Sequence, residues 1–152
     1  MAVEDTVVRN LAVQNLSSQD SAGHDMTAGV QRVRVLLVED EFLVSDMMAE
    51  ILGLHGFDVH TAANADEALE HLTGGEPCDI LLTDLNLGPG IDGVTLAKMV
   101  RDMRPDLSVV YVSGSFNRLD EFQAVPGAKF VPKPYNPHKL CTMLGQLPIS
   151  RH

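Results

Sequence analysis

The chain of 152 residues is short of several residue types, and each shortage narrows what the protein can be. Tryptophan is absent, and the two cysteines, Cys78 and Cys141, are too few for a disulfide framework and lack metal-ligand spacing. We interpret both as buried, reduced thiols. No apolar stretch approaches the roughly 20 residues of a membrane span. The acidic N-terminus has no apolar signal-peptide core, so we expect a cytoplasmic protein without a membrane segment.

Basic residues are also scarce. Eleven lysines and arginines stand against 21 acidic residues, which gives a formal net charge of −10. Because sequence-independent nucleic-acid binding needs a basic surface, we expect no direct nucleic-acid partner. The hydrophobic content of 45% and the charged content of 21% are ordinary for a soluble globular protein. A chain of this length can form one domain that buries about 70% of its unfolded surface.

The first part of the chain differs in composition from the rest. The polar, small-residue stretch 17–23 is typical of a linker. The apolar residues before it could form a short amphipathic helix, but we favour a frayed tail. We therefore predict a flexible extension over 1–31, a folded domain over 32–147 and a C-terminal tail over 148–152. Only six residues follow Gln146, so we expect no effector domain.

From Arg32 onward, short apolar runs alternate with segments of helical pattern. This alternation is typical of an α/β fold, in which right-handed crossovers build a parallel sheet covered on both faces. The predicted strands cover 33–38, 57–61, 78–83, 107–112 and 128–131. The predicted helices cover 41–54, 64–73, 92–103, 117–124 and 136–146. Asn64 and Asn136 are predicted N-caps, the first with Glu67 in a capping-box spacing and the second followed by Pro137.

Polar side chains follow four of the predicted strands, at the point where each strand ends. They are Glu39, Asp40, Asp84, Ser113 and Lys133. Ligands of such sheets bind at the carboxyl ends of the strands, so we expect these side chains to converge. Converging carboxylates repel by a few kcal/mol at about 4 Å and an effective dielectric of about 20. A divalent cation would relieve that repulsion.

The acidic side chains predict a magnesium site, because Mg²⁺ prefers hard oxygen ligands and often takes one or two carboxylates. Asp40 and Asp84 are the predicted direct ligands, and Glu39 would bind directly or through water. The backbone carbonyl of Asn86 could complete the share of the protein. A carboxylate such as Asp84 can also attack phosphorus and form an aspartyl phosphate.

Two further side chains could hold a transferred phosphoryl group. Lys133 stands between two prolines, and its ammonium could pair with Asp84 at rest and with a phosphoryl oxygen afterwards. The Lys133–Pro134 bond is a candidate cis peptide, since X–Pro bonds adopt cis at modest cost. The hydroxyl of Ser113 could donate to the same phosphoryl group, and Gly114 leaves space beside it.

These positions closely resemble the receiver domain of bacterial two-component response regulators, over about residues 32–147. The resemblance rests on Glu39–Asp40, Asp84, Ser113 and Lys133–Pro134, which agree in order, spacing and strand context. It implies a flavodoxin-like fold, a doubly wound parallel sheet with strand order 2-1-3-4-5. It also implies Mg²⁺-dependent phosphorylation of Asp84 by a phosphohistidine on a sensor histidine kinase or histidine phosphotransferase.

The resemblance also implies a switch. Ser113 would move toward the phosphoryl group, and Phe130 would rotate inward after it, although plain core packing is the alternative for Phe130.

The sequence departs from the family pattern in three places. The loop 87–93 is one residue longer than the turn it resembles. The stretch after Ser113 is short, so we expect a reduced fourth helix. The first acid is Glu39, where aspartate is commoner.

The first predicted helix has more apolar residues than one buried stripe needs. They are Phe42, Leu43, Val44, Met47, Met48, Ile51, Leu52 and Leu54. Either neighbouring helices cover the surplus, or it forms a docking surface for the helical bundle of a kinase.

The histidines of the predicted domain are scattered, and no metal-site spacing links them. They are His55, His60, His71 and His138.

Three functions are consistent with these residues. The leading hypothesis is a stand-alone receiver in a phosphorelay, which accepts and loses a phosphoryl group but is not otherwise an enzyme. The second is a phosphatase with an aspartyl nucleophile. Such enzymes, by family resemblance, carry a general acid two residues after the nucleophile, where this chain has Asn86. The third is a receiver-like scaffold that is never phosphorylated.

Overall fold

The structure, a computed structural model, describes residues 32–116 and 123–149. The elements, in chain order, are β1 (Arg34–Val38), α2 (Phe42–Leu54), β2 (Asp58–Ala62), α3 (Ala65–Thr73), β3 (Ile80–Asp84), α4 (Gly93–Met103), β4 (Ser108–Ser113), β5 (Lys129–Pro132) and α6 (Pro137–Gly145). They agree with the predicted elements to within one or two residues at each end. The predicted extension over 1–31, and residues 117–122 of the predicted helix 117–124, lie outside the described residues.

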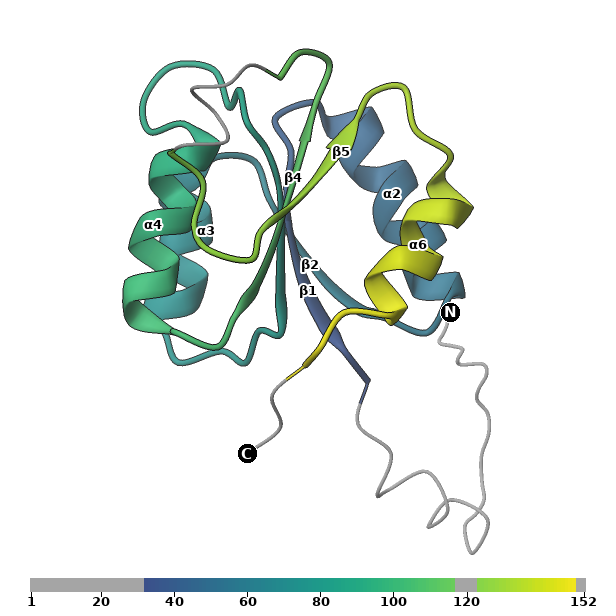
Figure 1. The fold of residues 1–152 in the computed structure, drawn as a ribbon, viewed down its shortest axis with the longest axis horizontal. Helices are drawn as coiled ribbons and strands as arrows, with labels where there is room; N and C mark the ends of the chain where they lie inside the picture. Colours follow the sequence, from purple (N-terminus) through teal and green to yellow (C-terminus); the bar gives the residue numbers. More distant parts are fainter. Residues whose placement is uncertain (1–31, 117–122, 150–152) are drawn as a thin grey trace, which may run out of the picture. The chain divides into compact units, whose positions relative to one another are not determined.

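The five strands form one parallel sheet in the order β2-β1-β3-β4-β5. The predicted flavodoxin-like, doubly wound α/β fold is therefore confirmed. Figure 1 shows α3 and α4 on one face of the sheet and α2 and α6 on the other. The strand order reverses beside β1, where the chain leaves β1 for one face and β3 for the other. Such a switch point opens a crevice at the carboxyl ends of the strands.

Alternate residues of the central strands supply two hydrophobic clusters, because successive side chains of a strand point to opposite faces. Leu36 and Leu81 belong to the cluster beneath α3 and α4. Their neighbours Leu37 and Leu82 belong to the cluster beneath α2 and α6. Burial on both faces explains why β1, β3 and β4 are nearly continuous apolar runs. Ile149, in the predicted C-terminal tail, packs against the second cluster.

Side-chain caps fix where the helices begin. Asn64 Oδ1 accepts from the Glu67 N–H at 2.8 Å, and Glu67 Oε1 accepts from the Ala63 N–H at 2.9 Å. Asn136 Oδ1 likewise caps α6, which starts with a proline. These interactions confirm the predicted caps. Asp92 caps α4 through a 2.8 Å bond from the Thr95 N–H, a cap that the sequence analysis did not identify.

No helix among residues 32–116 and 123–149 is long and apolar enough to cross a membrane.

Candidate functional site

Three carboxylates gather at the carboxyl ends of two neighbouring strands. Glu39 and Asp40 follow β1 directly, and Asp84 is the last residue of β3. One oxygen of each side chain lies within 4.8 Å of the others. Because β1 and β3 pair in parallel, their carboxyl ends lie at the same edge of the sheet. The structure thus brings together the three acids that the sequence analysis expected to converge, and we call them the acid cluster.

The acid cluster ranges from buried to exposed. Glu39 keeps 7% of its surface exposed, whereas Asp40 is exposed. Burial raises the pKa of Glu39, and a side-chain hydrogen bond with Asp40 and the negative charge of Asp84 act in the same direction. A hydrogen bond of 3.1 Å from the Glu41 N–H to Glu39 Oε2 works against the rise. Burial therefore makes the anionic form of Glu39 costly.

Lys133 is the cation of the site. Its Nζ donates to Asp84 Oδ2 at 2.8 Å and lies 3.7 Å from Glu39 Oε1. Partial burial acts to lower the pKa of Lys133, but the hydrogen bond and the charge of Asp84 outweigh it and raise that pKa. One ammonium is thus shared between two of three acids, so the site keeps a net negative charge that would attract a cation.

The backbone places Lys133 at the end of β5. Its N–H donates to the carbonyl oxygen of Ser113 at 2.8 Å, which extends the pairing of β4 with β5 beyond the last strand residue. The Lys133–Pro134 peptide bond is cis, as predicted.

Asn86 and Gly93 shape the loop that follows Asp84. The Asn86 N–H donates to Asp84 Oδ1 at 3.1 Å, so each oxygen of Asp84 has one protein donor. The Gly93 N–H donates to the Leu85 carbonyl at 2.9 Å, which closes the loop on itself. A Cβ at Gly93 would collide with the Asp84 carbonyl oxygen. Sequence reasoning missed this steric role, although a glycine at the start of a helix was a visible signal.

The long loop 87–93 passes beside the acid cluster. Gly88 has a φ of 77°, and a Cβ built on it would lie 3.7 Å from Asp40 Oδ2. The positive φ favours glycine there, since other residues rarely adopt it. The inserted glycines therefore bring bare backbone close to the most exposed acid.

Ser113 lies at the carboxyl end of β4, as predicted, and its hydroxyl is hydrogen-bonded to Ser115. Its Oγ donates to the Ser115 carbonyl at 3.0 Å and accepts from the Ser115 N–H at 3.1 Å. The side chain is 1% exposed, so this small loop holds the hydroxyl under cover. The structure therefore groups Glu39, Asp40, Asp84 and Lys133 by direct contact, with the Ser113 hydroxyl engaged elsewhere.

Phe130 is half-buried on β5 between two aromatic rings. Its centroid lies 5.2 Å from that of Tyr111 and 5.1 Å from that of Phe116, the latter edge-on. The Tyr111 hydroxyl accepts from the Val125 N–H at 3.3 Å. Phe130 also packs against the first cluster, as the core-packing alternative requires. Sequence reasoning missed Tyr111 and Phe116 as its neighbours, because no spacing rule links a strand to the loop beyond it.

The doubly wound sheet carries three carboxylates and one lysine at its carboxyl edge, a set of side chains that is compatible with a metal site. The profile of the response regulator receiver domain matches residues 35–145. The chain therefore belongs to the response regulator receiver domain family.

Relatives and solved structures agree with this assignment. The chain is 34% identical over 118 residues to the transcriptional regulatory protein AruR of Pseudomonas aeruginosa, covering 70% of this chain and 46% of AruR. A response regulator receiver protein from Sinorhizobium medicae superposes with a TM-score of 0.72 at 28% identity, covering 76% of this chain and 94% of that one. A CheY-like receiver domain protein from Methanospirillum hungatei gives 0.71 at 27%, covering 76% and 93%. The chain spans less than half the length of the curated relatives it matches.

Proposed function

We propose that the chain is the phosphoacceptor of a two-component phosphorelay, in which Asp84 takes a phosphoryl group from a phosphohistidine donor. The observation that carries the proposal is the 2.8 Å contact between Lys133 Nζ and Asp84 Oδ2 within the acid cluster. A carboxylate held this way is fixed in position and keeps lone pairs free for attack. Membership of the receiver family supports the same assignment.

The acid cluster fits Mg²⁺, because its donors are all carboxylate oxygens and their repulsion is only partly offset by Lys133. Asp40 and Asp84 would bind the ion directly, Glu39 directly or through water, and the Asn86 carbonyl would add a fourth oxygen. Bound there, the ion would neutralise charge on the phosphoryl oxygens during transfer. The exposed side of Asp40 leaves room for water ligands.

In the transfer step, an oxygen of Asp84 forms a bond to phosphorus as the P–N bond of the phosphohistidine breaks. The electron pair of that bond stays on the imidazole nitrogen of the donor. Lys133 Nζ then pairs with a phosphoryl oxygen in place of Asp84 Oδ2. The Ser113 hydroxyl leaves Ser115 and donates to another phosphoryl oxygen, and Phe130 follows by turning inward.

The outer side of α2 supplies a docking surface for the donor. Phe42 and Leu43 are 76% and 80% exposed, and Met47 is 47% exposed. The helix begins two residues after Asp40, so this surface adjoins the acid cluster. Neighbouring described helices do not cover these side chains, which favours the docking alternative of the two considered from the sequence. A helical domain of a sensor histidine kinase or histidine phosphotransferase is the partner we propose.

We also propose that the protein is not a turnover enzyme. We propose further that it acts in the cytoplasm and signals by binding a protein rather than nucleic acid. Asn86 occupies the position of the general acid that an aspartyl phosphatase would need, and an amide cannot protonate a leaving group. The net charge of −10 supports a protein partner.

Incubation with acetyl phosphate and Mg²⁺, followed by intact mass measurement, tests the proposal. We expect one phosphoryl adduct on the wild type, none on Asp84→Asn and none in chelator. Asp102→Asn is the matched control, since this exposed acid lies near the far end of α4 and should leave the adduct intact. Absence of the adduct from the wild type would overturn the proposal and favour the scaffold. An adduct that survives Asp84→Asn would overturn it by showing that another residue accepts the phosphoryl group.

A further inference from the structure

Two histidines 83 residues apart in sequence meet on the α2–α6 face of the sheet. His55 Nε2 and His138 Nδ1 lie 2.9 Å apart, and the ring centroids lie 5.1 Å apart. Both side chains are exposed. His55 is the C-cap of α2, and His138 lies in the first turn of α6. The fold therefore brings two ring nitrogens within hydrogen-bond distance of each other at a place that water can reach.

Both histidines stand on rigid backbone. The His55 N–H donates to the carbonyls of Ile51 and Leu52, which ties it to the last turn of α2. The His138 N–H donates to Asn136 Oδ1 at 2.9 Å, which ties it to the cap of α6. The two helices pack through the second hydrophobic cluster, to which Leu52 belongs. The ring nitrogens are thus held near each other before any ligand arrives, which favours binding.

We propose that His55 and His138 form a binding site for a borderline divalent transition metal such as Zn²⁺. Two imidazoles on one tetrahedral Zn²⁺, at Zn–N distances of about 2.0–2.1 Å, have nitrogens about 3.3 Å and centroids about 5.2 Å apart. The observed centroid separation of 5.1 Å already matches. The two ring nitrogens now face each other in a hydrogen bond. If each ring tilts by about 35° and the nitrogens separate by about 0.4 Å, their lone pairs converge on one ion, whose Zn–N bonds replace the hydrogen bond.

The remaining coordination positions would be filled by water. The ring that now donates the hydrogen bond would change tautomer. Its proton would move to its own outward-facing nitrogen, His55 Nδ1 or His138 Nε2, and that N–H would donate to water. Imidazole nitrogen suits Zn²⁺, Ni²⁺ and Cu²⁺, whereas Mg²⁺ prefers oxygen. The site is therefore chemically separate from the acid cluster and does not depend on the proposed phosphorylation.

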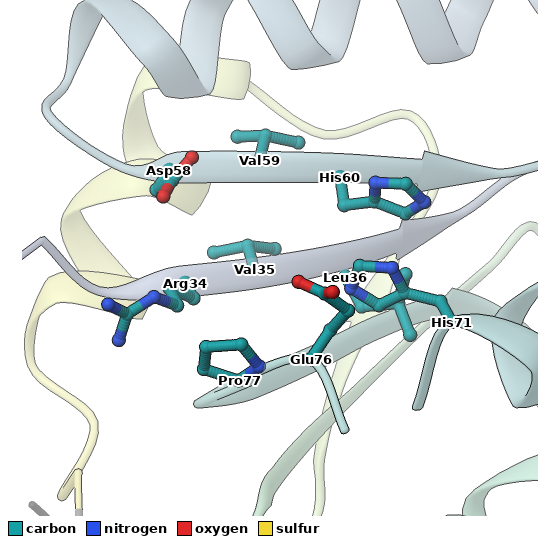
Figure 2. Close-up of a pocket in the computed structure, with 9 residues that line it drawn as sticks. All are labelled: Arg34, Val35, Leu36, Asp58, Val59, His60, His71, Glu76 and Pro77. Atoms are coloured by element: carbon teal, nitrogen blue, oxygen red, sulfur yellow. The ribbon is translucent and has the colours of Figure 1, made fainter. Parts of the chain in front are cut away.

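A second histidine pair has a geometry in which the two rings cannot bind the same ion. His60 and His71 stack with centroids 3.7 Å apart and ring planes 15° apart. Figure 2 shows them beside Glu76 in a pocket of about 220 Å³ next to β1 and β2. Nearly parallel rings aim their lone pairs in parallel, so one ion cannot lie in both ring planes. This pair is the matched control for the proposed site.

A Zn²⁺ titration of the full chain, followed by ring ¹⁵N signals of labelled histidines, tests the site. We expect the signals of His55 and His138 to shift together and to saturate at one Zn²⁺ per chain. Mg²⁺ should leave both unchanged. At Zn²⁺ about 100-fold above Kd, the melting temperature should rise by about 5–10 °C, because the ion binds the folded chain.

Variants separate this site from the other histidines. His55→Gln and His138→Gln should each abolish the shift of the remaining partner and the rise in melting temperature. The double variant His60→Gln/His71→Gln should keep both. The proposal is overturned if the wild type shows no paired shift, if the response survives in His55→Gln, or if it is lost in His60→Gln/His71→Gln. Circular dichroism checks that each variant is folded. We expect all of them to fold, because His55, His60 and His138 are exposed and His71 is only half-buried.

Discussion

The helices on the two faces of the sheet differ in how many large apolar side chains they expose. On one face, α3 buries Ala65, Ala68 and Leu72 and turns charged residues outward. On the other face, α2 buries Ser45, Met48 and Leu52 but exposes Phe42, Leu43, Met47 and Leu54. A helix needs only one apolar stripe to fold onto a sheet. The outer residues of α2 therefore contribute little to the fold, and contact with a partner is the use we propose for them.

The strongest test of this comparison sets the inner side of α2 against its outer side. Leu52 is fully buried and Leu43 is 80% exposed, so the same truncation should differ sharply between them. We expect Leu52→Ala to lower the free energy of unfolding by about 2–5 kcal/mol. Leu43→Ala should change it by no more than about 0.5 kcal/mol. Urea unfolding measures both, and equal losses would mean that the outer side is part of the core.

The thiol of Cys78 tests the α3–α4 face of the sheet through the pH dependence of unfolding. Burial against the first cluster raises the pKa of Cys78 from 9.0 to about 11. The unfolded thiol therefore ionises first, and the folded state holds its proton more tightly. As pH rises from 9 toward 11, the free energy of unfolding should fall by up to about 3 kcal/mol. Cys78→Ala should flatten this dependence in denaturation curves at each pH. An identical fall in the variant would contradict the assignment.

Two glycines lie in helices on opposite faces of the sheet. Substituting alanine for each should change the free energy of unfolding in opposite directions. A Cβ at Gly93 collides with the Asp84 carbonyl, so Gly93→Ala should cost about 2 kcal/mol and slow phosphorylation of Asp84. Gly53, in the last turn of α2, has nothing within 4 Å of such a Cβ. Gly53→Ala should therefore stabilise by up to about 1 kcal/mol. Thermal melts and acetyl phosphate assays measure the pair, and a harmless Gly93→Ala would show that the loop can move.

We expect the smallest change in the free energy of unfolding from Asp40, at the carboxyl edge of the sheet. Asp40→Asn relieves repulsion with Glu39 and Asp84, so in chelator the free energy of unfolding should stay within about 0.5 kcal/mol of the wild type or rise slightly. With Mg²⁺ added, the wild type should gain more in melting temperature than the variant. A large loss in chelator would mean that Asp40 stabilises the fold itself.

Much of the fold could be predicted from the sequence, because apolar runs and caps are local signals. The strand order 2-1-3-4-5 is not local, and it came from the resemblance to a family. The meeting of Glu39, Asp40 and Asp84 followed from the rule that parallel strands end at one edge. The His55–His138 contact could not be predicted in this way, since it depends on how α2 and α6 pack. The orientation of the Ser113 hydroxyl also depends on a loop that no pattern describes.

In the proposed switch, the hydrogen bonds of the Ser113 hydroxyl determine how often the unphosphorylated protein adopts the turned state. Ser113 Oγ exchanges two hydrogen bonds with Ser115, each with a net value of about 0.5–1.5 kcal/mol. Turning toward Asp84 without a phosphoryl group would forfeit both. The two bonds together are worth about 1–3 kcal/mol, so the turned state would be populated at roughly one molecule in six to one in 160. In the switch that we propose, the two hydrogen bonds between Ser113 and Ser115 would therefore limit the signal that the chain gives before phosphorylation.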